Sequence, residues 1–245
     1  HAVHTVSYVK ALTELTLDAK AVRSIGFPLS AALVERELRI AQGTVVGCNH
    51  ALENGIAFNI AGGTHHAFSD RGEAFCLLND QAIAAQYLIN QKKCHKILIV
   101  DLDVHQGNGT AEIFQNNADV ITFSMHGQSN YPFRKETSDY DIALPDKTDD
   151  TTYLSILQET LPELLNIHRP DFVFYLAGVD ILGTDKLGKL GCTLEGCKTR
   201  DSYVLGLCKS LGIPVQVSMG GGYSPAIKTI IEAHANTYRV ARALY

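Results

Sequence analysis

The segment Lys96–Thr110, KILIVDLDVHQGNGT, places the strongest constraint on how this chain folds. It opens with the β-branched and aliphatic run Ile97–Val100, which favours a buried strand. Asp101, Asp103 and His105 follow at alternate positions, and alternate side chains of an extended chain leave the same face. The glycines after His105 indicate a tight turn with close approach to the backbone. Two carboxylates and an imidazole are poor core material, so we interpret this strand end as a functional site.

The rest of the chain alternates short apolar runs with amphipathic helical patterns. We predict strands at 56–60, 97–100, 120–125, 171–177 and 213–218. We predict helices at 6–17, 30–41, 44–53, 79–90, 110–115, 150–168 and 194–211, a last helix ending near 243, and loops at 18–29 and 127–146. Apolar strands between helices indicate an α/β fold: a single-domain, open, mostly parallel sheet with helices on both faces. In such sheets ligands bind at the carboxyl ends of the strands, and every polar cluster here follows a predicted strand.

Composition narrows the class of protein. The 245 residues are 46% hydrophobic, enough for one sizeable core, and no linker divides them. The net charge of −5 predicts no direct binding to nucleic acid and none to anionic membrane. We find no apolar run near the roughly 18 residues of a membrane span, and no signal peptide, which favours the cytoplasm. The six scattered cysteines, including the close pair Cys192 and Cys197, are predicted to be structural thiols.

Asp103, His105 and Asp180 form a candidate metal site. They offer one nitrogen and two oxygen ligands, and three protein ligands with an open position are typical of catalytic zinc. The same donors are compatible with Fe(II) or Co(II). A bound metal would lower the pKa of a water to about 7 and polarise a carbonyl group. A salt-bridge cluster without metal is disfavoured, because so many buried carboxylates would repel one another.

Two adjacent histidines, His65 and His66, lie in the glycine-flanked loop AGGTHHAF. Near a metal, they are better explained as general acid–base catalysts than as ordinary surface histidines. Asp101 is the natural partner of one and Asn108 of the other, and an anionic partner raises the pKa of a histidine more than a neutral one does.

The segment GGGY, which ends at Tyr223, permits two interpretations. As a phosphate-binding turn it lacks the GxGxxG spacing, and the other glycine turn, QGNGT, follows acidic residues that would repel phosphate. We prefer a flexible turn that presents the Tyr223 hydroxyl to an oxyanion near the metal.

These residues lie in six motifs that resemble, in family order, the zinc-dependent histone deacetylase superfamily with the arginase/deacetylase fold. The motifs are GGTHHAF (62–68), FCLLND (75–80), IVDLDVHQGNGT (99–110), FSMH (123–126), LAGVDILGTDKLG (176–188) and MGGGYSP (219–225). The likeness covers 1–245 as one histone deacetylase-like catalytic domain, and IGFP (25–28) and HANTYRVA (234–241) resemble class IV and bacterial members. The chain begins at His1, and the family's first strand is not recognisable before it. We therefore expect the amino-terminal part of the fold to be missing.

The resemblance implies a role for each site residue. It implies Zn²⁺, or Fe²⁺ in vivo, held by Asp103, His105 and Asp180, with Asp101 supporting His65, Asn108 supporting His66, and Tyr223 stabilising the transition state. It implies a structural K⁺ held by Asp101, Asp103, His105, Ser124 and Met125. It implies an acyl tunnel lined by Gly63, Phe75 and Gly221, with either Tyr131 or Phe133 as the opposite wall. Asn108 stands where some members carry Asp, which leaves the protonation schedule of His66 open.

The predicted function is a zinc-dependent amide hydrolase that removes acetyl or longer acyl groups from N-ε-acyl-lysine in a protein or peptide, by attack of metal-activated water. Small acylated amines such as acetylpolyamines are the alternative substrates, for which acidic residues should surround the tunnel mouth. The acidic stretches 136–141 and 146–150 are candidates, although solvated loop charge explains them better. A catalytically silent acyl-lysine-binding module would lack a ligand, a histidine or the tyrosine, and a nucleotide-binding protein would lack the metal cluster. The likeness to bacterial members indicates a cytoplasmic, bacterial protein of undetermined oligomeric state.

Overall fold

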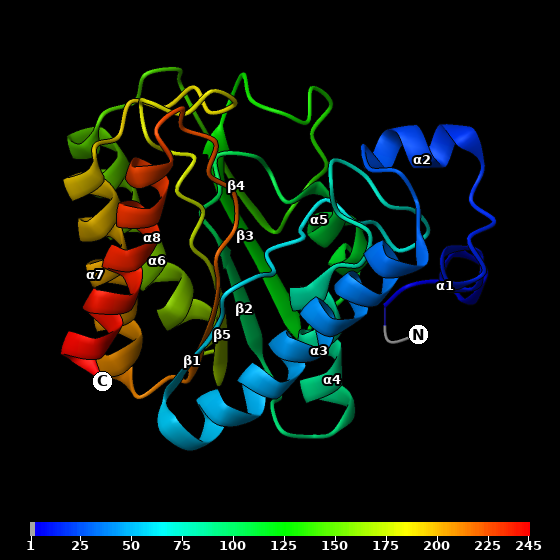
Figure 1. The fold of residues 1–245 in the computed structure, drawn as a ribbon. Coiled ribbons are helices and arrows are strands. Elements are labelled where there is room, and N and C mark those ends of the chain that lie inside the picture. The colour runs from blue at the N-terminus through cyan, green and yellow to red at the C-terminus, as the bar shows by residue number, and fades with distance from the viewer. Residues whose placement is uncertain (1–2) are drawn as a thin grey trace.

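The computed structural model describes residues 3–245 as one α/β unit built on a single sheet (Figure 1). Its six strands are β1 (Ile56–Asn59), β2 (Ile97–Asp101), β3 (Val120–Gly127), β4 (Tyr140–Leu144), β5 (Phe172–Leu176) and β6 (Val215–Ser218). All neighbouring strands are parallel, in the order β1-β6-β5-β2-β3-β4. The predicted fold class is therefore confirmed, with β2 near the centre of the sheet.

Helices cover both faces of this sheet (Figure 1). They are α1 (Val6–Thr13), α2 (Ala19–Ile25), α3 (Ala31–Asn54), α4 (Asp80–Asn90), α5 (Asn108–Phe114), α6 (Asp150–His168), α7 (Leu194–Leu211) and α8 (Ile227–Leu244). Leu98 and Val100 of β2 pack into the cluster formed with α6, α7 and α8. Ile97 and Ile99 face the opposite cluster, formed with α3, α4 and α5. Alternate residues of β2 thus enter two different cores, which explains why this strand is apolar throughout.

All six cysteines are free and buried; Cys197 lies in α7 and Cys192 just before it, and both pack in the core. This is the environment expected of structural thiols. None of the helices within residues 3–245 combines the length and the apolar character that a membrane span requires.

Three predictions of secondary structure were wrong. The two helices predicted at 30–41 and 44–53 form the single helix α3, which continues through Gly43. An interior glycine costs a helix only about 1 kcal/mol, and packing of the flanking turns outweighs that cost. The predicted loop 18–29 contains α2, whose seven residues are too few to show a period. The predicted loop 127–146 contains β4, an edge strand that pairs only with β3 and whose residues alternate between exposed and more buried positions.

A buried ion pair supports the strand ends on which the site is built. Arg200 of α7 is fully buried, and its guanidinium donates two hydrogen bonds to Asp201 at 2.9 and 2.8 Å. A third guanidinium nitrogen donates to the carbonyl of Gly178 at 2.6 Å, just after β5. The pair therefore fixes the backbone two residues before Asp180.

Replacing Asp201 with alanine should destabilise the protein by about 3–5 kcal/mol, because it leaves the Arg200 charge buried without a partner. Tyr175 and Thr237 also donate to this carboxylate and would lose their acceptor. Urea denaturation measures the difference. The exposed pair Lys198–Glu195 provides the control, since Lys198→Ala should change stability by less than about 1 kcal/mol. A similar small change for Asp201→Ala would show that the buried pair is not needed.

Candidate active site and metal centre

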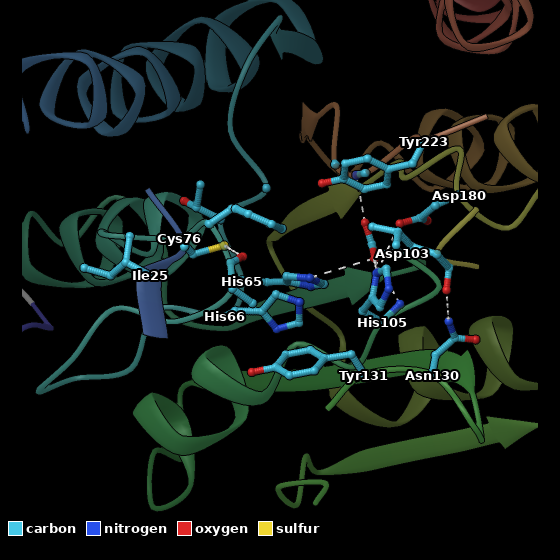
Figure 2. Close-up of a pocket in the computed structure, with 18 of the residues that line it drawn as sticks. Ile25, His65, His66, Cys76, Asp103, His105, Asn130, Tyr131, Asp180 and Tyr223 are labelled. Carbon is cyan, nitrogen blue, oxygen red and sulfur yellow. Dashed lines mark hydrogen bonds and ion pairs between the residues drawn. The ribbon is translucent and has the colours of Figure 1, made fainter. Parts of the chain in front are cut away.

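The predicted site residues surround one cavity of about 710 Å³ at the carboxyl edge of the sheet (Figure 2). Its lining includes Gly63, His65, His66, Phe75, Asp103, His105, Tyr131, Phe133, Asp180, Gly221 and Tyr223. Asp101 and Asn108 lie behind the lining and bind the two histidines. The structure therefore brings the predicted metal ligands, histidines, tyrosine and aromatic residues to a single place.

Asp103, His105 and Asp180 each offer a ligand atom, and these atoms lie within 4.8 Å of one another. The strand does not extend to this point, because β2 ends at Asp101. A turn brings the ligands together instead: the Asp101 carboxylate accepts the Asp103 amide at 3.2 Å, and the Asp103 carboxylate accepts the His105 amide at 3.0 Å. Such turns, in which Asp binds the amide two residues on, are typical of strand ends. The expectation of an extended chain was wrong here, although the convergence it predicted is present.

This cluster has the properties of a divalent metal site. Burial and the neighbouring Asp103 raise the pKa of Asp180. Its buried Oδ2 accepts no hydrogen bond from the described residues, and His105 Nδ1 lies 3.3 Å from this oxygen. A side chain at Gly221 would clash with the Asp180 carboxylate, and one at Gly178 with that of Asp103. The backbone therefore closes tightly around two buried carboxylates. A divalent cation would offset their repulsion and satisfy the unpaired oxygen.

The two histidines pack against each other, with ring planes tilted by 49°, in contrasting environments. Their ring centroids are 4.1 Å apart. His65 Nδ1 donates to Asp101 at 2.6 Å, whereas His66 Nδ1 donates to Asn108 at 2.7 Å. Burial lowers the pKa of both rings, but Asp101 and Asp103 outweigh this for His65 and raise its pKa to about 9. Burial and the charge of His65 hold the pKa of His66 well below its usual value. One neutral and one protonated histidine therefore lie side by side.

The buried carboxylate of Asp80 shapes the histidine loop. The sequence indicated a helix start here but no role in the site. Asp80, the first residue of α4, is fully buried and accepts the amides of Gly63 and Thr64, both at 2.9 Å. Gly62 and Gly63 have φ values of +86° and +83°, which favour glycine. This turn directs both adjacent histidines inward, which an extended chain would not do.

The GGGY segment closes the cavity on the side of Asp180, where Figure 2 places Tyr223. The Gly221 amide donates to Asp103 at 2.8 Å, and the Tyr223 amide donates to Asp185 at 2.5 Å. Burial and the charges of Asp103 and Asp180 raise the pKa of the Tyr223 phenol, which therefore keeps its proton. Because carboxylates surround this turn, it suits a hydrogen-bond donor and not a phosphate site.

The aromatic residues occupy different depths of the cavity. The Tyr131 ring packs edge-on against His66, with centroids 5.1 Å apart at 89°. Phe133 is 91% exposed and lies at the outer edge. Phe75 packs against Phe27 at 5.1 Å. Of the two candidates that the sequence left open, Tyr131 is therefore the one in the inner wall.

The predicted K⁺ ligands lie beneath this site. Asp101 and Ser124 are register partners on β2 and β3, and Met125 follows on β3. Asp103 and His105 continue from the end of β2. The potassium ion stays a prediction.

Sequence reasoning missed the part of the cavity that α2 and α3 contribute. Ile25 and Ile40 line it, together with Cys76. Ile25 and Cys76 lie on the opposite side of the histidines from Asp180 (Figure 2). Ile25 was missed because residues 18–29 were predicted to be a loop. In the sequence, only the capping residues Asp18 and Gly26 indicate the short helix α2 that carries Ile25.

Comparison with known proteins gives a consistent result. The family described as Histone deacetylase domain matches residues 1–238. An uncharacterized protein from the cyanobacterium Picosynechococcus is 48% identical over 243 residues, 99% of this chain and 81% of that protein. Histone deacetylase 2 of Arabidopsis thaliana is 31% identical over 77% of this chain and 50% of its own length. Histone deacetylase RPD3 of Saccharomyces cerevisiae is 33% identical over 69% and 40%, respectively.

The fold agrees with these sequences. The crystal structure of the HDA15 HD domain superposes with a TM-score of 0.78 at 25% sequence identity, covering 99% of this chain and 70% of that one. The chain spans half or less of the length of the two eukaryotic relatives.

Asp180→Ala should abolish metal binding, because it removes one of three ligands from the cluster. After incubation with Zn²⁺ and gel filtration, elemental analysis should find about one zinc per chain in the original protein and far less in the variant. Zinc should also raise the melting temperature of the original protein only, since a ligand of the folded state stabilises it. Asp146→Ala removes an exposed carboxylate and should change neither result. Full zinc content in Asp180→Ala would place the metal elsewhere.

Proposed function

The chain belongs to the histone deacetylase family, and from that membership we propose that it is a metal-dependent hydrolase that removes acyl groups from N-ε-acyl-lysine in proteins or peptides. One observation carries the proposal: a single cavity combines a three-residue metal cluster, two histidines bonded to an anionic and a neutral partner, and a phenol. These are the groups that metal-assisted amide hydrolysis needs.

Asp103, His105 and Asp180 would hold the metal, for which we propose zinc. When bound, a divalent ion supplies Lewis acidity, which polarises a carbonyl group and lowers the pKa of a water. The unpaired oxygen of Asp180 and the crowding of the two carboxylates support this assignment.

His66 would act as the general base. Its Nδ1–H is held by Asn108, so a neutral ring has its lone pair on Nε2, and His66 lines the cavity. Nε2 would take a proton from the attacking water. A protonated histidine of the pair would then give a proton to the leaving lysine amine. His65 bonds to Asp101, whose charge favours the protonated ring, and a protonated ring would place positive charge where the oxyanion develops.

Tyr223 would stabilise the tetrahedral oxyanion by donating its phenolic hydrogen. The raised pKa of this phenol supports a donor role, because the proton is retained at neutral pH. The backbone bonds of Gly221 to Asp103 and of Tyr223 to Asp185 hold the turn that carries it.

Phe75 and Tyr131 would flank the lysine side chain and its acyl group. The cavity continues past the histidines to Ile25, Ile40 and Cys76, where Arg36 and Glu37 also line it. The apolar side chains of this extension support acyl groups longer than acetyl.

The lining disfavours acetylpolyamines. Its exposed charges are cationic, from Arg23, Arg36 and Lys189, and would repel a polycation. The acidic stretches 136–141 and 146–150 contribute no residue to the lining. Instead, Asp141 accepts from Gln106, and Asp149 caps α6. Their charges therefore serve local structure.

We extend the proposal to the finer points that the resemblance implies. These are a structural K⁺ beneath the site, a class IV-like member and a bacterial, cytoplasmic location. The cyanobacterial relative at 48% identity supports the bacterial assignment.

Tyr223→Phe should lower kcat for acyl-lysine peptides by about 100- to 1,000-fold, the usual effect of removing one oxyanion donor, while KM changes little. Release of lysine from acetyl and myristoyl peptides by the zinc-loaded protein measures this, and the ratio of the two rates tests the apolar extension. Tyr203→Phe removes a phenol that bonds the Gln158 carbonyl on the surface and should keep full activity. If the original protein cleaves acetylpolyamines but neither peptide, the substrate assignment is wrong.

A further inference from the structure

Glu73 lies in the segment between the histidine pair and Phe75 and makes contacts that no step described above uses. Its Oε1 accepts a hydrogen bond from the Tyr131 hydroxyl and another from the Asn108 side-chain amide, the latter at 3.4 Å. Its Oε2 lies 3.7 Å from Arg71 Nε. One carboxylate therefore joins the aromatic wall of the cavity to the partner of His66.

The backbone holds Glu73 firmly in this place. The Glu73 amide donates to the Cys76 carbonyl at 2.9 Å, and the Cys76 amide returns a bond to Glu73. The next two amides donate to the last turn of α2: Ala74 to Ser24 at 2.9 Å, and Phe75 to Ile25 at 2.7 Å. These bonds do not involve the Glu73 side chain, so a substitution there leaves them intact.

Asn108 needs such a neighbour because its side chain has two unlike ends. The oxygen accepts a hydrogen bond, and the nitrogen donates one. In the observed orientation the oxygen faces His66 Nδ1 at 2.7 Å and the nitrogen faces Glu73. If the Asn108 amide rotated by 180°, its NH2 group would face His66 Nδ1. His66 Nδ1 would have to carry the lone pair that accepts the hydrogen bond. The proton would then lie on Nε2, and the ring could not act as a base toward the cavity.

We infer that Glu73 is a positioning residue that fixes the orientation of Asn108 and, through it, the Nδ1–H tautomer of His66, while it anchors the Tyr131 wall. An ionised carboxylate can only accept hydrogen bonds, so it attracts the nitrogen end of Asn108 and leaves the oxygen for His66. Asn108 is neutral and brings no negative charge to His66. Glu73 supplies that charge indirectly, because its carboxylate binds Asn108. The effect on catalysis rests on the proposed function, in which His66 is the general base. The effect of Glu73 on the tautomer of His66 does not depend on that function.

The tautomer can be measured without turnover. Nitrogen–proton correlation spectra of zinc-loaded protein labelled with ¹⁵N-histidine distinguish protonated from unprotonated ring nitrogens. The chain has ten histidines, and a His66→Gln variant identifies the His66 signals. We expect the original protein to carry the His66 proton on Nδ1. In Glu73→Ala a second form, with the proton on Nε2, should appear, and kcat should fall about 10- to 100-fold with a smaller change in KM.

Three further variants sharpen the test. Glu73→Gln keeps an acceptor oxygen and should restore the original spectrum and most of kcat. Asn108→Asp in the Glu73→Ala background should return the His66 proton to Nδ1, because a carboxylate has two equivalent oxygens and needs no orienting neighbour. Asp70→Ala removes an exposed carboxylate from the same loop and should leave the tautomer unchanged.

The outcomes separate this inference from the proposed function. An unaltered His66 spectrum in Glu73→Ala would overturn the inference, whatever the activity. A tautomer change in Tyr131→Phe equal to that in Glu73→Ala would also overturn it, since the effect would then pass through the wall and not through Asn108. If the original protein cleaves no acylated amine but Glu73→Ala still shifts the tautomer, the inference stands and the proposed function fails.

Discussion

Buried carboxylates crowd the carboxyl edge of the parallel sheet, and the neighbours that compensate them determine the structure of the site. Five aspartates are buried: Asp80, Asp101, Asp103, Asp180 and Asp201. A buried charge is tolerated only when it is paired or well hydrogen-bonded. Amides and hydroxyls surround Asp80, His65 pairs with Asp101, and Arg200 pairs with Asp201. Asp103 and Asp180 share one imidazole: His105 Nδ1 lies 3.0 Å from Asp103 and 3.3 Å from Asp180 Oδ2, and that Asp180 oxygen accepts no hydrogen bond from the described residues. A cation would bind at this place.

Much of this arrangement could be predicted because parallel strands end at a common edge. A continuous apolar run followed by Asp or His was sufficient to group the ends of β2 and β5, where Asp101 and Asp180 lie. The local geometry could not be predicted in the same way. Alternation along a strand suggested one face for Asp103 and His105, whereas turns beyond β2 direct them. The predicted convergence of Asp103 and His105 is nevertheless present. Leu102 and Val104 pack into the core, so the side chains of Asp103 and His105 face the cavity.

The features that escaped prediction depend on contacts between distant segments. The last turn of α2 accepts amides from the segment that carries Glu73 and Phe75, and nothing local to either segment indicates this pairing. The choice between Tyr131 and Phe133 was open for the same reason, since both are aromatic and two residues apart. The Tyr131 side chain points inward because its hydroxyl donates a hydrogen bond to Glu73 and its ring packs against His66. Sequence spacing carries no information about either partner.

The two glycine turns of the site meet through Asp80, which touches neither the cavity's metal cluster nor its aromatic wall. Its carboxylate binds the amides of the histidine turn, the Thr44 hydroxyl of α3 at 2.6 Å and the Ser218 hydroxyl at the end of β6 at 3.4 Å. Ser218 leads directly into the turn that carries Tyr223, and a side chain at Gly63 would press against the Gly220 backbone. Neutral donors distribute the charge without an ion pair, so the carboxylate holds two backbone turns in contact. The spacing between the histidines and the phenol is therefore fixed from beneath, by a buried anion in the first turn of α4.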